Sequence, residues 1–316
     1  MKKPTAIIDK SLLQAICEQP PDKRDLCFNA MLAHYVLVVP EILLEEVWVN
    51  LANPSPGKSP ATIKMMVDCL LHLRDAWIAE PLEIAFGELV KHESIEILPK
   101  PPPFVMDSFF ILRPDDAGLR KWVKERKELH KTIIRQRVSE HVGIFDTKTS
   151  AAIRSEREFG EHFMRPKFLA ILSDPTRKRS LLEGVFGLTF RTRHPDCSNE
   201  IDAAFEEYSQ DTFDRYPVTF NCIMAVMFYL HAPLCKIVHP NGKECKILGR
   251  SPRDQQSNLN DEKYVQSALL CARLATRDRG MRNIMELFKA CGLWNGETVF
   301  IDPRRDVTVE IPTCLV

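Results

Sequence analysis

Four acidic residues occupy positions where folding can bring their carboxylates together: Asp9, Glu46, Asp261 and Asp278. Asp9 and Asp278 each follow a short apolar run that predicts a strand, and a helix is expected after each of them. Asp261 and Glu46 fall on the apolar faces of predicted amphipathic helices. The carboxyl ends of strands border the ligand crevice in open α/β sheets, so Asp9 stands where a functional acid is expected.

A cluster of carboxylates suits divalent cations. Magnesium and manganese prefer oxygen ligands. Two such cations can activate a water molecule and stabilise the charge that develops when a phosphodiester is hydrolysed. Without a cation, four clustered acids would repel one another, raise the pKa of at least one of them and lower the stability of the fold. The residue types therefore indicate a carboxylate site that binds a divalent cation.

Two of the acids also have a purely structural interpretation. Asp261 can cap the N-terminus of its helix by accepting hydrogen bonds from free backbone amides. Asp278 can be a turn residue before Gly280, because Asp and Gly are both common in turns. For these two acids, the functional interpretation is favoured over the structural one only because Asp9, near the N-terminus, adds a further acid.

The helix that carries Glu46 contains two neighbouring glutamates. Residues in a helix are separated by about 100°, which places Glu46 between Ile42 and Leu43 on the apolar side. Glu45 is expected to lie beside an exposed Glu41. Glu46 is therefore the better candidate for an inward-facing acid. Its structural alternative is a rim residue whose aliphatic stem packs while its carboxylate stays in water.

The segments around the acids predict alternating strands and helices. Strands are expected at residues 5–8, 35–39, 95–98, 274–276 and 298–301, and the apolar tail at residues 307–316 is expected to add an edge strand. Helices are expected from Ser11 onward, then over residues 20–34, 41–51, 61–77, 82–91, from residue 260 onward, and over 281–291, where Gly292 is a good C-cap.

A boundary is expected at the run KPPP, residues 100–103, because consecutive prolines do not fit regular structure. The charge-rich region over residues 101–254 is expected to be mainly helical. Its most basic helix, at residues 120–137, either follows a phosphate backbone or is an ordinary solvated face. A second basic cluster at residues 177–179, with Arg191 and Arg193, would support nucleic-acid binding only if it shares that surface.

Composition limits the partners and the compartment. The chain has 43 Lys plus Arg and 43 Asp plus Glu, so no overall field attracts nucleic acid and such binding must come from a local patch. The N-terminus has no apolar stretch long enough for a signal peptide, and residues 220–238 are too interrupted for a membrane span. The ten cysteines are expected to be reduced thiols, many of them buried. We expect a soluble, cytoplasmic protein with no membrane partner.

These features resemble the PIN-like nuclease domain family. The resemblance rests on TAIIDKSLL around Asp9, LVVPEILLEEVWVNL around Glu46, NDEKYVQSALL around Asp261, and LATRDRGM around Thr276 and Asp278. The last segment is the most specific, because a small hydroxyl residue, a basic residue and an Asp ahead of a helix form the family's usual fourth motif. The resemblance covers residues 1–100 and 255–316. Residues 101–254 depart from the family pattern and are expected to be a helical insertion.

The resemblance implies an α/β fold with a central, mostly parallel sheet flanked by helices, and a metal-dependent endoribonuclease, since most proteins of this kind cut RNA. It implies Mg²⁺ or Mn²⁺ as the cofactor, with Asp9, Glu46 and Asp261 as principal ligands and Asp278 as a ligand or water-orienting acid. Supporting roles are expected for Thr276, Glu45 and Ser11. Substrate phosphates are expected to meet Lys10, Arg277, Lys121, Lys124, Lys127 and Lys131.

Two other functions are consistent with the same residues. The first is a PIN-like binding or regulatory protein that does not cut, which the neutral charge and the large insertion favour. That insertion is long enough to cover the site, to recruit a protein partner or to form a homo-oligomer. The second is a structure-specific DNA nuclease, whose fold is related. The presence of all four acids favours cleavage over binding alone.

Overall fold

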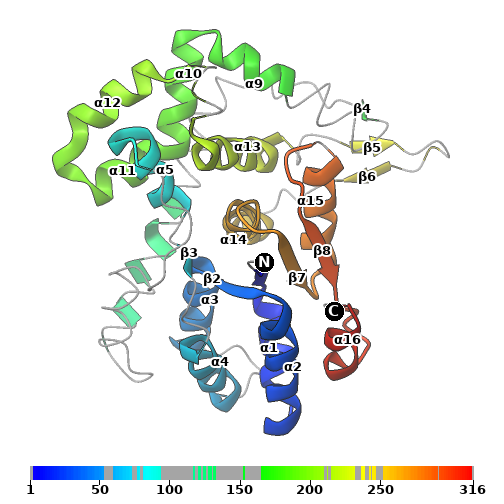
Figure 1. Cartoon of the computed structure of the whole chain (residues 1–316). Coiled ribbons are helices and arrows are strands. Elements are labelled where there is room, and N and C mark those ends of the chain that lie inside the picture. The colour runs from blue at the N-terminus through cyan, green and yellow to red at the C-terminus, as the bar shows by residue number, and fades with distance from the viewer. Residues whose placement is uncertain are drawn as a thin grey trace.

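A five-stranded parallel sheet lies at the centre of this computed structural model, which is an α/β fold (Figure 1). The strands are β1 (Thr5–Ile8), β2 (Val36–Pro40), β3 (Trp77–Ile78), β7 (Arg273–Thr276) and β8 (Glu297–Phe300), in the order β3-β2-β1-β7-β8. The structure describes residues 3–52, 60–72, 77–78, 81–93, 152–153, 165–209, 212, 215–231, 236–238, 242, 244–246, 252–290 and 292–314, with single positions between 117 and 132.

The central strand β1 is buried along its length. Ala6, Ile7 and Ile8 are almost wholly inaccessible to solvent. Ala6 pairs with Leu37 of β2 on one side and with Arg273 of β7 on the other, both in parallel. A continuous apolar run is typical of a parallel strand covered on both faces of the sheet, which explains why this strand is evident in the sequence.

The strand order reverses at β1. The next strands in the chain, β2 and β3, lie on one side of β1, whereas β7 and β8 lie on the other. In open α/β sheets, the carboxyl ends of the two strands at such a switch point border the ligand crevice. Here those ends are followed by Asp9 and by the segment that begins at Thr276.

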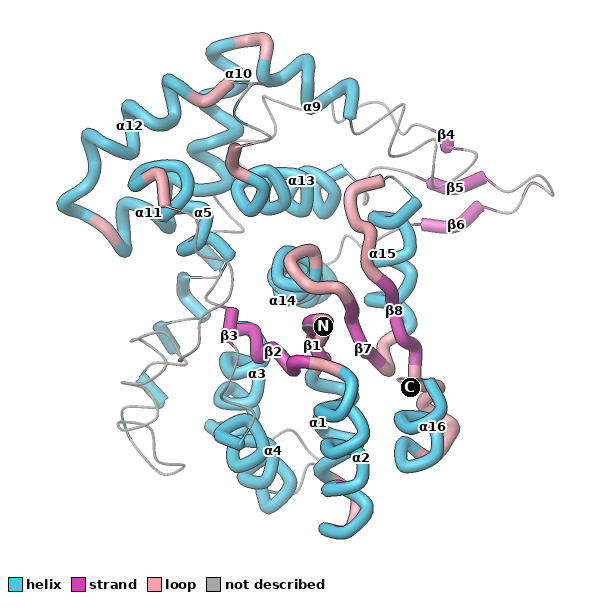
Figure 2. The backbone as a smooth tube through the Cα atoms, in the orientation of Figure 1, coloured by secondary structure: helices cyan, strands magenta, loops and turns pink. Residues whose placement is uncertain are grey.

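Helices cover both faces of the sheet. Figures 1 and 2 show α1, α2, α4 and α16 on one side and α14 on the other. Their bounds, with those of the helices that join them, are α1 (Lys10–Cys17), α2 (Pro21–His34), α3 (Glu41–Ala52), α4 (Pro60–His72), α5 (Pro81–Lys91), α14 (Pro252–Ala268), α15 (Arg279–Ala290) and α16 (Val307–Cys314). α16 packs on α2, and α14 contacts α3 and α15, so every helix has a partner across the sheet or beside it.

A second group of helices stands over α14, with a small mixed sheet at one end (Figures 1 and 2). The elements are β4 (Ala152–Ile153), α9 (Arg165–Leu172), α10 (Pro175–Leu182), a π-helical turn (Glu183–Gly187), α11 (Leu188–Arg193), α12 (Ser198–Glu207), α13 (Pro217–His231), β5 (Lys236–Val238) and β6 (Glu244–Lys246). α13 packs on both α5 and α14. The aromatic pair Phe228 and Phe288, with ring centroids 5.1 Å apart, links α13 to α15.

A buried carboxylate fixes α13 to α5. Glu88 of α5 is 1% exposed and accepts hydrogen bonds from the backbone N–H groups of Val218 and Thr219, at 3.2 and 2.7 Å. The Thr219 hydroxyl donates to the same carboxylate at 2.9 Å. The first N–H groups of a helix have no partner within the helix, and the N-terminus carries partial positive charge. A carboxylate from another helix accepts hydrogen bonds from these N–H groups and is attracted by that charge.

Several predicted elements differ from the structure. The helix expected over residues 61–77 ends at His72, and Trp77 belongs to β3. The tail was expected to be an edge strand, but it forms α16. Asp306 caps this helix by accepting a hydrogen bond from the Thr308 N–H, and the side chains of Val307 and Ile311 are buried at helical spacing. The predicted KPPP boundary and the strand at residues 95–98 lie outside the described residues, as does most of the helix at residues 120–137.

The cysteines that the structure describes are free thiols, in agreement with the sequence: five are buried and Cys197 is half-buried. The closest two, Cys17 and Cys69, have sulfur atoms 3.6 Å apart. Within the described ranges, no helix has the length and apolar character that crossing a membrane requires.

Candidate functional site

Asp9 is held rigidly at the end of β1. Its side chain caps α1 by accepting a hydrogen bond from the Leu12 N–H at 2.8 Å, and it also accepts from the Ser11 hydroxyl at 2.8 Å. The Asp9 N–H donates to the carbonyl of Ala275 at 3.2 Å, which extends the pairing of β1 with β7. The side chain is buried, and burial raises its pKa, with a further increase from Asp278.

Thr276 connects this carboxylate to the segment after β7. The hydroxyl of Thr276, which is fully buried, donates a short hydrogen bond to Asp9. The same oxygen accepts a hydrogen bond from the Asp278 N–H at 2.9 Å. Two hydrogen bonds in series therefore fix the position of Asp278 relative to Asp9, even though the residues are far apart in the chain.

Asp278 is exposed and caps α15. Its Oδ1 accepts hydrogen bonds from the N–H groups of Gly280 at 2.6 Å and Met281 at 3.1 Å. A Cβ atom at Gly280 would lie 3.0 Å from this oxygen, so the absence of a side chain permits the close approach. Asp278 therefore has the structural role in the turn that the sequence allowed. This role engages its Oδ1, just after the carboxyl end of β7.

Glu46 joins three helices at the edge of the crevice. Its carboxylate accepts a hydrogen bond from the Tyr264 hydroxyl at 3.0 Å. The Lys10 ammonium and the Asn260 side-chain amide each lie 3.4 Å from the other oxygen. The Glu46 side chain is 18% exposed, so it is neither free in solvent nor enclosed. α1, α3 and α14 are thus brought together around one carboxylate.

Asp261 lies within α14 and is not the N-cap that the sequence allowed. The helix begins at Pro252 and ends at Ala268, so Asp261 is in its second half. Burial raises the pKa of Asp261 to about 7, and the carboxylates of Asp278, Glu46 and Asp9 add to this increase in that order. The four predicted acids therefore lie close enough to act on one another electrostatically.

These acids suit a hard cation by their chemistry. All of their donor atoms are oxygens, and a bound cation would oppose the burial and the neighbouring carboxylates that together raise the pKa of Asp261. The side chains do not form a closed ligand set, because no three His, Cys, Asp or Glu side chains in the described ranges are grouped closely enough to hold a metal ion. Asp9, which is buried after β1, and Asp261, a half-buried residue of α14, are the acids that we expect to be first ligands.

Glu45 and Glu41 are buried, which corrects the prediction that this side of the helix is exposed. Each is 4% exposed, and Glu45 pairs with Lys263 of α14 at 3.4 Å. The prediction was wrong because no pattern within α3 indicates that α14 covers this face of the helix. Glu45 is engaged in a buried ion pair beside the acids and supports the packing of the two helices.

Two tyrosines near the acids were not identified from the sequence. Tyr264 is buried and stands three residues after Asp261, a spacing that places both on one face of α14 and could have indicated it. Tyr229 of α13 is 6% exposed. Burial raises its pKa well above the usual value, and Asp261, Glu262 and Asp278 add to the increase. No signal marked Tyr229, because α13 is apolar around most of its circumference.

The predicted phosphate-binding cations are placed unevenly. Lys10 faces Glu46, and Arg277 donates to the carbonyl of Pro303 at 2.6 Å. The lysines of the predicted basic helix are exposed at the described positions Lys121, Lys124, Lys127 and Lys131. Two of them face acids of the same helix: Lys121 lies 3.8 Å from Glu125 and Lys131 lies 2.6 Å from Glu128. Their binding role stays a prediction.

The second basic cluster is occupied by internal ion pairs. Arg191 pairs with Glu183 at 2.5 Å, and Arg179 with Asp202 at 2.6 Å. Arg193 pairs with Glu83 of α5 at 2.7 Å. These arginines join the helices between residues 175 and 207 to one another and to α5, which reduces the positive charge that they present to a phosphate.

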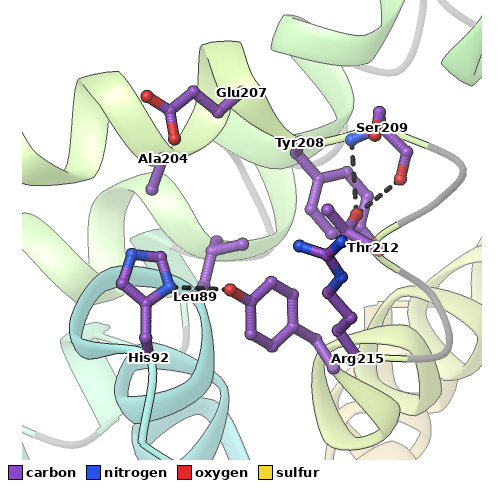
Figure 3. A pocket seen from close by; sticks show the side chains of 9 residues that line it. Leu89, His92, Ala204, Glu207, Tyr208, Ser209, Thr212 and Arg215 are labelled. Carbon is purple, nitrogen blue, oxygen red and sulfur yellow. Dashed lines mark hydrogen bonds between the residues drawn. The ribbon is translucent and has the colours of Figure 1, made fainter.

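A polar pocket of about 300 Å³ lies between α5, α12 and α13, away from the four acids, none of which lines it. Figure 3 shows His92 at this pocket. Its imidazole Nδ1 lies 2.6 Å from the phenol oxygen of Tyr216, with which it shares a hydrogen bond. His92 has a φ of 57°, a left-handed conformation that is uncommon outside Gly but that Asn, Asp and His adopt more often than other residues.

The candidate site thus consists of Asp9 and Asp278, which follow the two strands where the strand order reverses, and of Glu46 and Asp261 on the helices α3 and α14. Thr276 ties Asp9 to the segment of Asp278. Function is inferred from this arrangement alone. Comparison of the chain with models of protein families, with curated proteins and with solved structures found no match.

Proposed function

We propose that this chain is a PIN-like, metal-dependent nuclease that hydrolyses phosphodiester bonds, with RNA as its expected substrate. One observation carries the proposal: the charges of Asp278, Glu46 and Asp9 all raise the pKa of Asp261, although the four residues come from distant parts of the chain. Acids that lie far apart would have no such effect on one another. The expected cytoplasmic location stays part of the proposal.

The sheet supports the PIN-like fold. It is parallel throughout, and the segments that resemble the family supply β1, β2 and β7. The acids Asp9 and Asp278 follow two adjacent strands at their carboxyl ends, where the resemblance expects them. Residues 101–254 contribute the helices α9 to α13, which agrees with a mainly helical insertion for the part of that region that is described.

A bound Mg²⁺ or Mn²⁺ would supply an activated water and would stabilise charge on the phosphate. The chain's own residues perform the remaining tasks. Asp9 offers an oxygen whose position is fixed by Ser11, Leu12 and Thr276. Asp261 carries a proton on part of the molecules near neutral pH, so cation binding would displace that proton.

Replacing Asp9 or Asp261 with Asn tests the proposal. Asn keeps the size of the side chain and can still cap a helix, so Asp9→Asn is expected to fold. Each substitution is expected to abolish cleavage of single-stranded RNA in Mg²⁺ or Mn²⁺. Asp174→Asn is the matched control, because Asp174 also caps a helix, α10, but is exposed and far from the acids in the chain. Undiminished cleavage by both purified site variants would remove the assignment.

The substrate assay also distinguishes the alternatives. Preferential cleavage of flap or single-stranded DNA over RNA would identify a DNA nuclease. A binding protein that does not cut is favoured by one observation, namely that Tyr229 of the insertion is buried beside Asp261. Thermal stabilisation by Mn²⁺ without turnover of any nucleic acid would support that function.

A further inference from the structure

An arginine-rich pocket begins one residue after Asp278. Its volume is about 530 Å³, and its charged lining residues are Arg279, Arg282, Asp302, Arg304, Arg305 and Glu310. They come from the first turns of α15, from the segment after β8 and from α16. These elements lie together at the C-terminal edge of the sheet in Figure 1. The sequence had not indicated this cluster, because its members are separated by some twenty to thirty residues, well beyond the reach of one helix turn.

The pocket retains positive charge after its internal ion pairs are formed. Arg304 pairs with Asp302 at 2.7 Å, and Arg305 pairs with Glu310 at 3.0 Å. Arg279 and Arg282 form no ion pair with any residue that the structure describes. These two guanidinium groups therefore have no carboxylate partner, although Arg282 donates a hydrogen bond to the side-chain oxygen of Asn283 at 3.3 Å. They leave a local positive charge in a protein whose overall charge is zero.

The two guanidinium groups that lack a carboxylate partner are positioned for one ligand. Arg279 and Arg282 are three residues apart in α15, so they lie on the same face of the helix. The Arg282 guanidinium lies over the ring of Phe300, 4.7 Å from its centroid, and this cation–π contact restricts its position. Both residues are at the N-terminal end of a 12-residue helix, where the partial positive charge of the backbone also favours an anion.

The chemistry of these groups selects phosphate. A guanidinium presents paired N–H donors in a plane that matches two phosphate oxygens, and such charge-assisted hydrogen bonds are stronger than neutral ones. Asp278, one of the four acids of the site, is adjacent to Arg279 in the chain. A strand whose scissile phosphate lies at the acids therefore has a neighbouring phosphate within reach of the pocket.

We propose that Arg279 and Arg282 bind a phosphate of the nucleic-acid strand next to the one that is cut. This inference rests on the proposed nuclease function. Under this inference, the substrate backbone first contacts the chain beyond the acids at Arg279 and Arg282, and not at the basic helix predicted over residues 120–137.

The test measures binding rather than cleavage. Fluorescence anisotropy of a short single-stranded RNA, labelled at its 3′ end, is recorded in EDTA for the full chain and for the double variant Arg279→Gln with Arg282→Gln. The double variant is expected to bind at least about tenfold more weakly at low salt. Its plot of log affinity against log salt concentration is expected to be shallower by about 0.7 for each lost contact.

Lys289→Gln is the matched control. It removes one positive charge from the exposed C-terminal end of the same helix and does not line the pocket. This variant is expected to bind RNA as the unmodified chain does. Arg279→Lys with Arg282→Lys is the second variant, and partial recovery of binding by it would show that charge, rather than folding of α15, is responsible. Circular dichroism of all variants reports their helix content.

The outcomes separate this inference from the proposed function. Equal weakening for RNAs with a 5′-phosphate and a 5′-hydroxyl supports an internal phosphate, whereas weakening confined to the 5′-phosphate form, with competition by inorganic phosphate, supports a terminal one. Binding that is unchanged in the double variant overturns the inference, even if the chain cuts RNA. Binding that depends on the arginines in a chain that never cuts upholds the inference and refutes the nuclease.

Discussion

At the scale of single residues, the carboxyl group of Asp261 is the most informative. Its burial and its three acidic neighbours all act in the same direction and raise its pKa from the ordinary value of 3.8 to about 7. The folded chain therefore holds this proton at pH values where the unfolded chain has already lost it. The stability that results is fully present below pH 3.8 and is lost as the pH rises through about 7.

Asp261→Asn is expected to raise the melting temperature at pH 8 in EDTA, by about 2 °C or more, because it removes a charge that nothing relieves. Near pH 4 the difference should become small, since the protonated acid and the amide are both neutral. Mg²⁺ or Mn²⁺ should raise the melting temperature of the unmodified chain at pH 8 but not that of the variant. Differential scanning fluorimetry at the two pH values measures this, and a lower melting temperature for the variant at pH 8 would contradict it.

The Thr276 hydroxyl is the second informative group. It donates to Asp9 and accepts from the N–H of Asp278, so its removal leaves two buried or half-buried groups without that partner. Thr276→Val keeps the shape and should lower the free energy of unfolding by about 1–3 kcal/mol and reduce cleavage. Thr276→Ser keeps the hydroxyl and should stay close to the unmodified chain in urea unfolding. Equal loss in both variants would point to packing rather than to the hydrogen bonds.

At the scale of elements, α15 depends on Asp278 for its cap. The carboxylate accepts from Gly280 and Met281, which satisfies N–H groups that have no partner within the helix. The same side chain is one of the four acids whose charge acts on Asp261. Asp278 therefore both caps α15 and contributes charge beside Asp261. Two substitutions distinguish the effect of the cap from the effect of the charge.

Asp278→Asn should retain most of the stability, because Asn caps helices about as well as Asp, but should reduce metal-dependent cleavage. Asp278→Ala should lose cleavage and also about 1 kcal/mol of stability. Urea unfolding and a cleavage assay on the same preparations measure both effects. Full activity in Asp278→Asn would show that the charge of this residue has no part in the reaction.

At the scale of the whole molecule, Glu88 connects α5 to α13, a helix of the second group. It lies on α5 and caps α13 with a carboxylate that is almost completely buried. Glu88→Gln turns one acceptor into a donor that faces the N–H groups of Val218 and Thr219. We expect a loss of about 2 kcal/mol or more in the free energy of unfolding.

Because α13 carries Tyr229 to the acids, Glu88→Gln should also reduce cleavage by shifting that helix. Glu93→Gln is the control, since Glu93 is exposed at the end of the same segment. Equal stability in the two variants would show that the capping contact contributes little.

The sequence predicted those parts of the fold that depend on local pattern. The strand at residues 5–8 is a continuous apolar run between a proline and an acid, and it was predicted with the bounds that the structure has. The start of α14 was missed by several residues because its first half, from Pro252 to Asn258, is polar and has no apolar stripe. Pattern therefore predicted the strand before Asp9 better than it predicted the helix that carries Asp261.

The sequence could not predict which residues are buried by segments that are distant in the chain. The burial of Glu45 depends on Lys263 of α14, and the place of Tyr229 depends on how α13 packs. The charged pocket of Arg279 and Arg282 is formed by three segments with no shared motif. Such features arise from long-range packing, which periodicity within one element does not encode.

The pairing of β1 with β7 means that the central strand gains its second partner late. More than two hundred residues separate β1 from β7 in the chain. Until β7 has been made, one edge of β1 has no partner, and nascent chains that stop short of Arg273 would expose that edge to other chains. Asp9 likewise meets Thr276 only once β7 is present, so a chain that ends before Arg273 would lack the hydrogen bond on which the proposed site depends.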